Sequence, residues 1–98
     1  MIALSPEAQR QVDQLIQHYE TKERLEAAEN LLRALERASE RIAADPMSGL
    51  DAPRPYPSLA RHGRRWRIEG RYWISYSLGS PPIISGVFHA QANIPGRI

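Results

Sequence analysis

The residues best suited to recognition or chemistry lie in the last third of the chain. Five arginines fall between positions 61 and 71, a tryptophan follows at 73, and a histidine stands at 89. Guanidinium groups bind carboxylates and phosphates through paired hydrogen bonds, and tryptophan is a frequent anchor at interfaces. A solvated strand face is the plainer alternative. The pattern predicts a binding surface for an acidic partner, formed by Arg61, Arg64, Arg65, Arg67, Arg71, Trp73 and His89.

The chain offers little for metal or covalent chemistry. It has no cysteine, which excludes disulfides and thiolate ligands. His18, His62 and His89 show no ligand spacing. No serine stands in a Gly-x-Ser-x-Gly motif, and no glycine-rich loop could cradle phosphates. We therefore expect neither a metal nor a cofactor.

Charge is divided unevenly between the two halves of the chain. Residues 1–45 contain six basic and nine acidic residues, a net charge of −3, and residues 46–98 contain seven and two, a net charge of +5. The first residues lack the basic and apolar regions of a secretory signal. No apolar run approaches the ~20 residues that span a bilayer. We expect a cytoplasmic protein that meets no membrane and whose C-terminal half faces an acidic partner.

Two amphipathic helices precede the arginine-rich segment. The Ser-Pro-Glu run at residues 5–7 combines an N-cap, a proline suited to the first helical position and an early acid, so a helix should start there. The second helix should end near Ala44, just before a proline. Polar residues 20–24 should join the two as an antiparallel hairpin. The predicted core faces comprise Ala8, Val12, Leu15, Ile16 and Tyr19, then Leu25, Ala28, Leu31, Leu32, Leu35, Ala38 and Ile42.

The rest of the chain reads as strands and turns. Residues 1–4 are predicted to form a short first strand, and a proline-rich linker over residues 45–57 leads to three further strands. Alternation directs Trp73 away from the helices, into a binding groove unless a loop or the C-terminal tail covers it. The side chains directed toward the helices are Tyr72, Ile74, Tyr76 and Leu78. The predicted fold class is α+β in the order β-α-α-β-β-β, with a three-stranded antiparallel sheet, in one domain over residues 1–98.

Several short motifs follow one another along the chain. They are Leu-Ser-Pro-Glu-Ala at residues 4–8, an Ala- and Leu-rich run at 26–36, a Pro/Gly break at 45–49, Gly-Arg-Tyr-x-Ile-x-Tyr at 70–76, and a last strand ending in His89. In this order, and over nearly the whole chain, they resemble ParE-type toxins of the ParE/RelE superfamily. The resemblance implies the toxin of a bacterial type II toxin–antitoxin module, neutralised by a ParD-like antitoxin. Operator DNA would be met only indirectly, through the antitoxin.

The superfamily has two branches that differ in chemistry. ParE-like members resemble inhibitors that bind DNA gyrase, whereas RelE-like members resemble ribosome-dependent mRNA endonucleases. The latter commonly carry arginines at the positions of Trp73 and Ala90 here, and cleavage needs cations to stabilise the phosphorane. The resemblance therefore favours a gyrase inhibitor that is not an enzyme. The alternatives are a RelE-type RNase, with Arg71 and His89 as its catalytic residues, and a degenerate non-toxic member that acts only in antitoxin binding and autoregulation.

Overall fold

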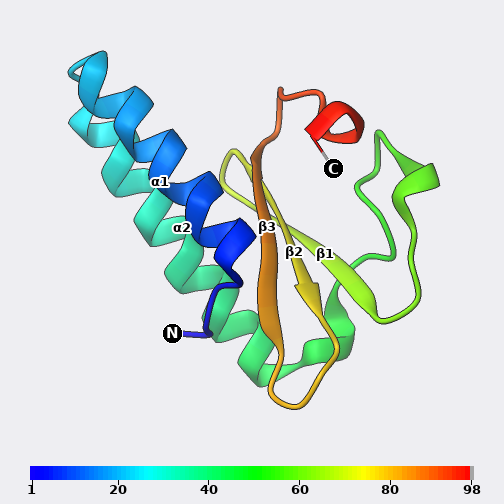
Figure 1. The fold of residues 1–98 in the computed structure, drawn as a ribbon. Coiled ribbons are helices and arrows are strands. Elements are labelled where there is room, and N and C mark those ends of the chain that lie inside the picture. The colour runs from blue at the N-terminus through cyan, green and yellow to red at the C-terminus, as the bar shows by residue number, and fades with distance from the viewer. Residues whose placement is uncertain (98) are drawn as a thin grey trace.

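Two helices pack against one face of a three-stranded sheet (Figure 1). The computed structural model describes residues 1–97; Ile98, which the single-domain prediction includes, lies outside the described residues. The helices are α1, Pro6–Thr21, and α2, Leu25–Ala44. The strands are β1, Arg64–Glu69, β2, Tyr72–Ser77, and β3, Ile83–His89. They pair antiparallel in the order β1-β2-β3, which confirms the α+β class and the three-stranded antiparallel sheet.

Local sequence signals set the start of α1 and the end of α2 as predicted. The hydroxyl of Ser5 accepts a hydrogen bond from the backbone N–H of Ala8 at 3.1 Å, and Pro6 occupies the first turn of α1. α2 ends at Ala44 because Asp45, which precedes a proline, is extended with a φ of −153°. Within residues 1–97, no helix has both the length and the apolar character required to cross a membrane.

The predicted first strand is wrong. The N-terminal segment makes a single parallel bridge, between Leu4 and Ile84 of β3. Two backbone hydrogen bonds form it, from Ser5 to Ile84 at 2.8 Å and from Ile84 to Ala3 at 3.0 Å. The chain enters α1 at Pro6, two residues after Leu4, so the pairing cannot extend further toward the C-terminus, and residues 1–3 form no regular structure.

The buried face of α2 differs in part from the predicted one. The buried residues on this helix are Leu31, Ala34, Leu35, Ala38, Ser39 and Ile42. Leu25 and Leu32, which were expected in the core, are 68% and 47% exposed. Leu25 stands in the first turn, and Leu32 lies about 100° around the helix from Leu31. The core face is therefore narrower than the leucine content suggests.

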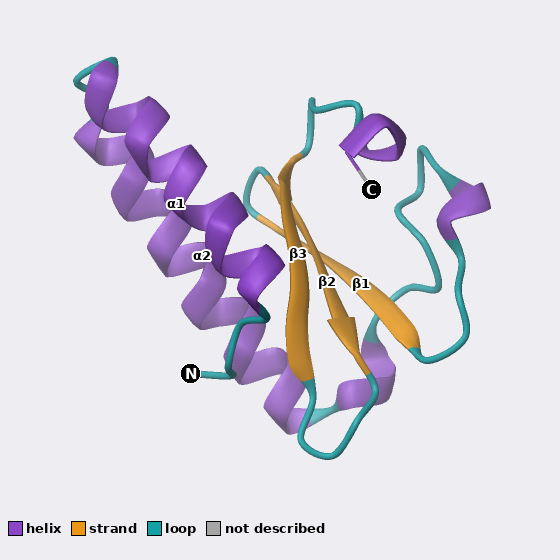
Figure 2. Ribbon diagram, in the orientation of Figure 1, coloured by secondary structure: helices purple, strands orange, loops and turns teal. Residues whose placement is uncertain are grey.

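The two faces of the sheet carry separate apolar clusters. The helix-side core joins both helices to Tyr72, Ile74, Tyr76, Ile84 and Val87, so the predicted direction of β2 is confirmed. On the opposite face, a loop-side core consists of Trp66, Trp73, Phe88 and Ile94. Irregular segments after α2 and a C-terminal turn, η3 (Ile94–Arg97), lie on that side (Figure 2).

The linker after α2 is fastened to the sheet by one tyrosine. The hydroxyl of Tyr76 donates a hydrogen bond to the carbonyl of Pro46 at 2.6 Å and accepts one from the N–H of Gly49 at 3.1 Å. Leu50 then exchanges two backbone hydrogen bonds with Trp66, of 2.7 and 2.8 Å. These contacts direct the proline-rich linker across the loop-side face.

Candidate functional site

The predicted site residues do not form one surface. Arg61, Arg64 and Arg65 line a shallow hollow of about 550 Å³ near the start of β1. Arg71 and His89 line a different and larger groove beside α1. The predicted residues therefore lie in separate places, because β1 alternates its arginines between faces and the Gly70 turn carries Arg71 to the other end of the strand.

Arg65 and Arg67 have partners within the protein. Arg65 donates to the carboxylate of Asp51 at 2.7 Å, and Arg67 donates to the hydroxyl of Ser48 at 2.7 Å. Their side chains are only 24% and 16% exposed. These two arginines hold the linker against β1, which reduces what they can offer to a partner.

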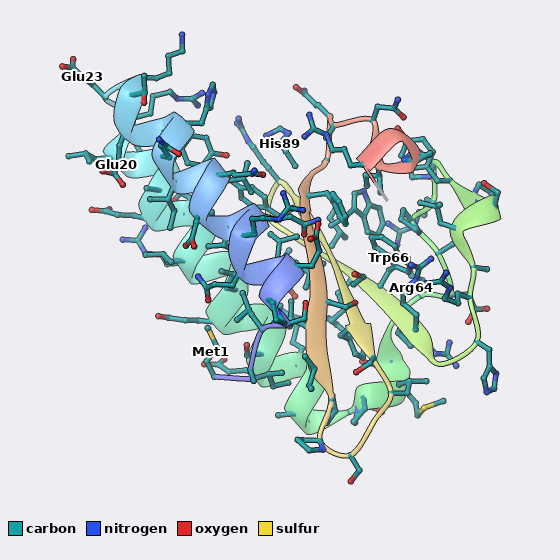
Figure 3. The ribbon with its side chains drawn as sticks, viewed as in Figure 1. Met1, Glu20, Glu23, Arg64, Trp66 and His89 are labelled. Carbon is teal, nitrogen blue, oxygen red and sulfur yellow. The ribbon has the colours of Figure 1, made fainter. Side chains whose placement is uncertain are left out.

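Trp73 is not the exposed anchor that its position on the sheet suggested. The ring is 3% exposed, in the loop-side core beneath Leu50, Tyr56 and Leu59. Arg64 lies over the neighbouring Trp66 ring, 5.2 Å from its centroid, on the side away from the helices (Figure 3). The linker and the C-terminal turn thus cover the face on which a groove was expected.

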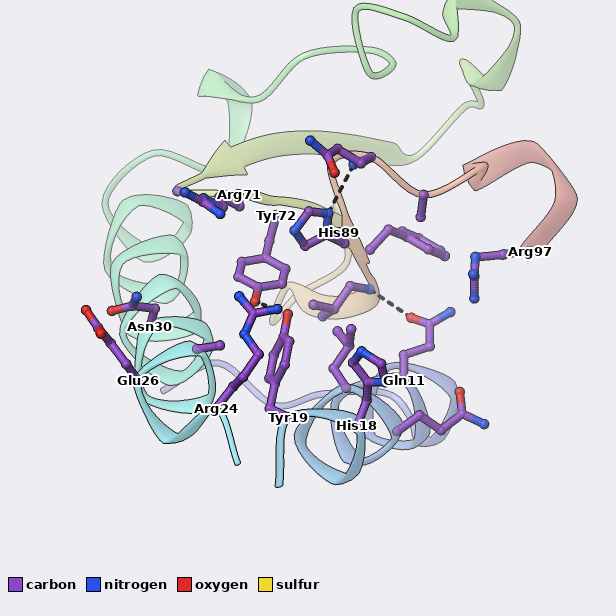
Figure 4. A pocket seen from close by; sticks show the side chains of 18 of the residues that line it. Gln11, His18, Tyr19, Arg24, Glu26, Asn30, Arg71, Tyr72, His89 and Arg97 are labelled. Carbon is purple, nitrogen blue, oxygen red and sulfur yellow. Dashed lines mark hydrogen bonds between the residues drawn. The ribbon is translucent and has the colours of Figure 1, made fainter. Parts of the chain in front are cut away.

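The larger of these two hollows lies at the other end of the molecule. It has a volume of about 1310 Å³ and opens between α1, the start of α2, and the ends of β2 and β3 (Figure 4). Five arginines and three glutamates contribute to its wall. They are Arg10, Arg24, Arg37, Arg71 and Arg97, with Glu7, Glu23 and Glu26.

An aromatic cluster forms the inner wall of this groove. The hydroxyls of Tyr19 on α1 and Tyr72 on β2 are hydrogen-bonded at 2.5 Å. The ring of His89 meets Tyr72 edge-on, with centroids 5.6 Å apart and planes at 85°. The guanidinium of Arg24 lies over Tyr19 at 5.7 Å from the ring centroid. The cluster therefore joins α1, the connection between the two helices, and the sheet.

The surroundings of His89 and Tyr72 shift their pKa values. Burial, and then Arg71 and Arg24, lower the pKa of His89 below its ordinary value, which favours the neutral imidazole. Burial, and then the hydrogen bond with Tyr19, raise the pKa of Tyr72 above its ordinary value. At neutral pH Tyr72 therefore remains protonated and is poorly suited to act as a general base.

The cations of the groove differ in whether they already have partners. Arg10 pairs with Glu7, and Arg37 lies 3.5 Å from the carboxylate of Glu69. Arg24, Arg71 and Arg97 form no salt bridge with any residue from 1 to 97. No group of three His, Asp or Glu side chains in the same range could hold a metal ion. The arrangement is suited to binding an anionic group.

Three residues of this cluster were absent from the predicted site. Tyr19 was assigned to the apolar stripe of the first helix, Tyr72 to the core face of a strand, and Arg24 to a polar connection. Tyr19 and Tyr72 are 53 positions apart, so no local spacing could have brought them together. The only available signal was their type, since a tyrosine on an apolar stripe carries a hydroxyl that requires a partner.

Comparisons with known proteins agree with this fold. No curated protein matches the chain significantly. A family model described as the ParE toxin of the type II toxin–antitoxin system, parDE, matches residues 2–93. This match covers both helices, all three strands and the inner wall of the groove. The chain belongs to the ParE toxin family of type II toxin–antitoxin systems.

Proposed function

We propose that this protein is a toxin that acts in the cytoplasm by binding DNA gyrase and that a ParD-like antitoxin neutralises it. The observation that carries the proposal is the family match over residues 2–93, which includes α1, α2 and the three strands of the sheet. Operator DNA is reached only through the antitoxin. The protein itself acts without a cofactor and without catalysis.

The groove supports a role in binding. Its wall contains three arginines without salt bridges to residues 1–97, beside an aromatic cluster of two tyrosines and His89. Such cations attract acidic protein segments and accelerate association. Its fixed aromatic side chains lose little conformational freedom when a partner binds. This combination is more typical of a docking site than of a catalytic centre.

The positions that distinguish RNase-type relatives support the same proposal. Trp73 is buried on the opposite face of the sheet, and Ala90 is an uncharged residue packed against the loop-side core. Neither can stabilise negative charge on a phosphorane. Arg71 and His89 line the groove, but Tyr72 beside them is a poor base because its pKa is raised. The RNase alternative is therefore not favoured.

Expression in growing bacteria tests the proposal. The chain alone should arrest growth and leave plasmid DNA relaxed, and co-expression of its antitoxin should restore both growth and supercoiling. Leu35→Ala removes a fully buried side chain and should destabilise the fold. It is therefore the negative control, in which the growth arrest should be reduced. Growth arrest with normally supercoiled plasmid DNA would contradict gyrase as the target.

A further inference from the structure

Two arginines of the groove, Arg24 and Arg71, are not neutralised by an acidic side chain of residues 1–97, although Arg24 also lies over the Tyr19 ring. Arg24 and Arg71 both lie close enough to Tyr72 and His89 to influence their ionisation, and Figure 4 shows them around the Tyr72 ring. Neither forms a salt bridge with residues 1–97. By contrast, three other arginines converge on the buried carboxylate of Glu69, namely Arg37, Arg41 and Arg67. The charges of Arg24 and Arg71 are therefore available to a ligand.

His89 adds a hydrogen-bond donor of known orientation. Its Nδ1 accepts the backbone N–H of Gln91 at 3.2 Å, so the neutral ring carries its proton on Nε2. The lowered pKa of His89, caused by burial and by Arg71 and Arg24, maintains this neutral form. The titratable and charged side chains that share the groove with it are Glu7, Arg10, His18, Tyr19, Glu23, Arg24, Glu26, Arg37, Arg71, Tyr72 and Arg97.

The shape of the groove indicates a peptide rather than a small ion. A volume of about 1310 Å³ far exceeds one carboxylate. The groove follows the outer edge of β3, where the N–H of Val87 is satisfied by the side-chain carbonyl of Gln11 at 2.8 Å rather than by another strand. Because that N–H is already bonded, a peptide segment in the groove would be held by side-chain contacts rather than by main-chain pairing with β3.

We propose that Arg24, Arg71 and the Nε2–H of His89 form a receptor for one carboxylate of an acidic peptide segment of the antitoxin, which lies along the groove. Guanidinium forks and a fixed N–H donor match the oxygen atoms of a carboxylate, and charge-assisted hydrogen bonds are stronger than neutral ones. The inference rests on the proposed function, because it assigns the antitoxin's acidic segment to this groove.

Binding of an oligoglutamate peptide at low ionic strength tests the receptor directly. By isothermal titration calorimetry, Arg24→Gln and Arg71→Gln should each weaken binding by roughly three- to tenfold, as expected for a partly exposed ion pair. His89→Phe keeps a ring against Tyr72 but lacks the donor, so it should weaken binding about threefold, whereas His89→Gln should bind nearly as wild type. Circular dichroism should show all four variants folded.

Two matched controls remove the same charge elsewhere. Arg54 and Arg61 are exposed and form no salt bridge within residues 1–97, so Arg54→Gln and Arg61→Gln should change peptide binding by less than about twofold. No binding to the wild type, or equal losses in the groove variants and the controls, would overturn the proposed receptor.

Binding of the protein encoded by the neighbouring gene distinguishes failure of the proposed receptor from failure of the proposed function. If the wild type captures this protein tightly, Arg24→Gln combined with Arg71→Gln should accelerate dissociation at least tenfold. Capture that these substitutions leave unchanged would refute the receptor and preserve the toxin–antitoxin assignment. Peptide binding as predicted, without capture of that neighbour, would instead refute the antitoxin as occupant together with the proposed function.

Discussion

The two faces of the sheet are buried by different means. Regular helices cover the face that bears Ile74, with side chains at helical spacing. The face that bears Trp73 is covered by the proline-rich linker and by Ile94 of the C-terminal turn. The difference shows that a sheet face without a helix above it can still be core. Consequently we expect the aromatic side chains there to stabilise the fold, and we propose that a partner binds instead in the groove beside α1.

The largest expected effect tests whether the loop-side face is true core. Trp73→Ala should destabilise the protein by about 3–5 kcal/mol, because it removes a buried ring from the cluster that Trp73 forms with Trp66, Phe88 and Ile94. Denaturant unfolding measures the loss. A folded variant with wild-type stability would show that Trp73 is accessible and would restore it as a candidate binding anchor.

On the helix side, the corresponding test is Leu35→Ala. Leu35 is 1% exposed in the core between α2 and the sheet, so truncation should cost about 2–5 kcal/mol in the free energy of unfolding. Leu32→Ala is the matched control, because Leu32 is 47% exposed and should change stability by less than about 1 kcal/mol. Equal losses would show that the assigned face of α2 is wrong.

This contrast also explains how far the sequence could predict the fold. Periodicity and capping signals located both helices, and alternation placed the β2 side chains on the correct faces, because these rules depend on neighbours in the chain. The cover over Trp73 could not be predicted in the same way. It comes from irregular segments without a period, held by long-range bonds such as that of Tyr76 to Pro46. The Tyr19–Tyr72 pair of the groove escaped prediction for the same reason.

A glycine at the bulge of β3 gives a smaller effect on the loop side. A methyl group at Gly86 would lie 2.7 Å from the ring of Phe88 and 2.7 Å from the hydroxyl of Ser75. Gly86→Ala should therefore cost about 1–3 kcal/mol through overpacking. Thermal unfolding would detect the loss as a lower Tm. An unchanged Tm would indicate that the loop-side core can rearrange to accommodate the added methyl group.

The smallest expected effect concerns the tyrosine pair of the groove. Tyr72→Phe removes one hydroxyl of the 2.5 Å hydrogen bond and should cost about 0.5–1.5 kcal/mol at neutral pH. Burial, and then Tyr19, raise the pKa of Tyr72 from 10.0, so the folded state retains its proton more strongly than the unfolded state. The wild type should thus lose stability as pH rises above about 10, and the variant should lose less. Identical alkaline unfolding curves would contradict this role.

The central claim is that this protein acts by binding gyrase and not by cleaving RNA. The most direct measurement is supercoiling by purified gyrase in the absence of ribosomes, with mRNA on translating ribosomes followed in parallel. We predict that the wild type inhibits supercoiling and leaves the mRNA intact. Ribosome-dependent cleavage that is abolished by His89→Ala or Arg71→Ala, with supercoiling unaffected, would contradict the account and identify the protein as an RNase.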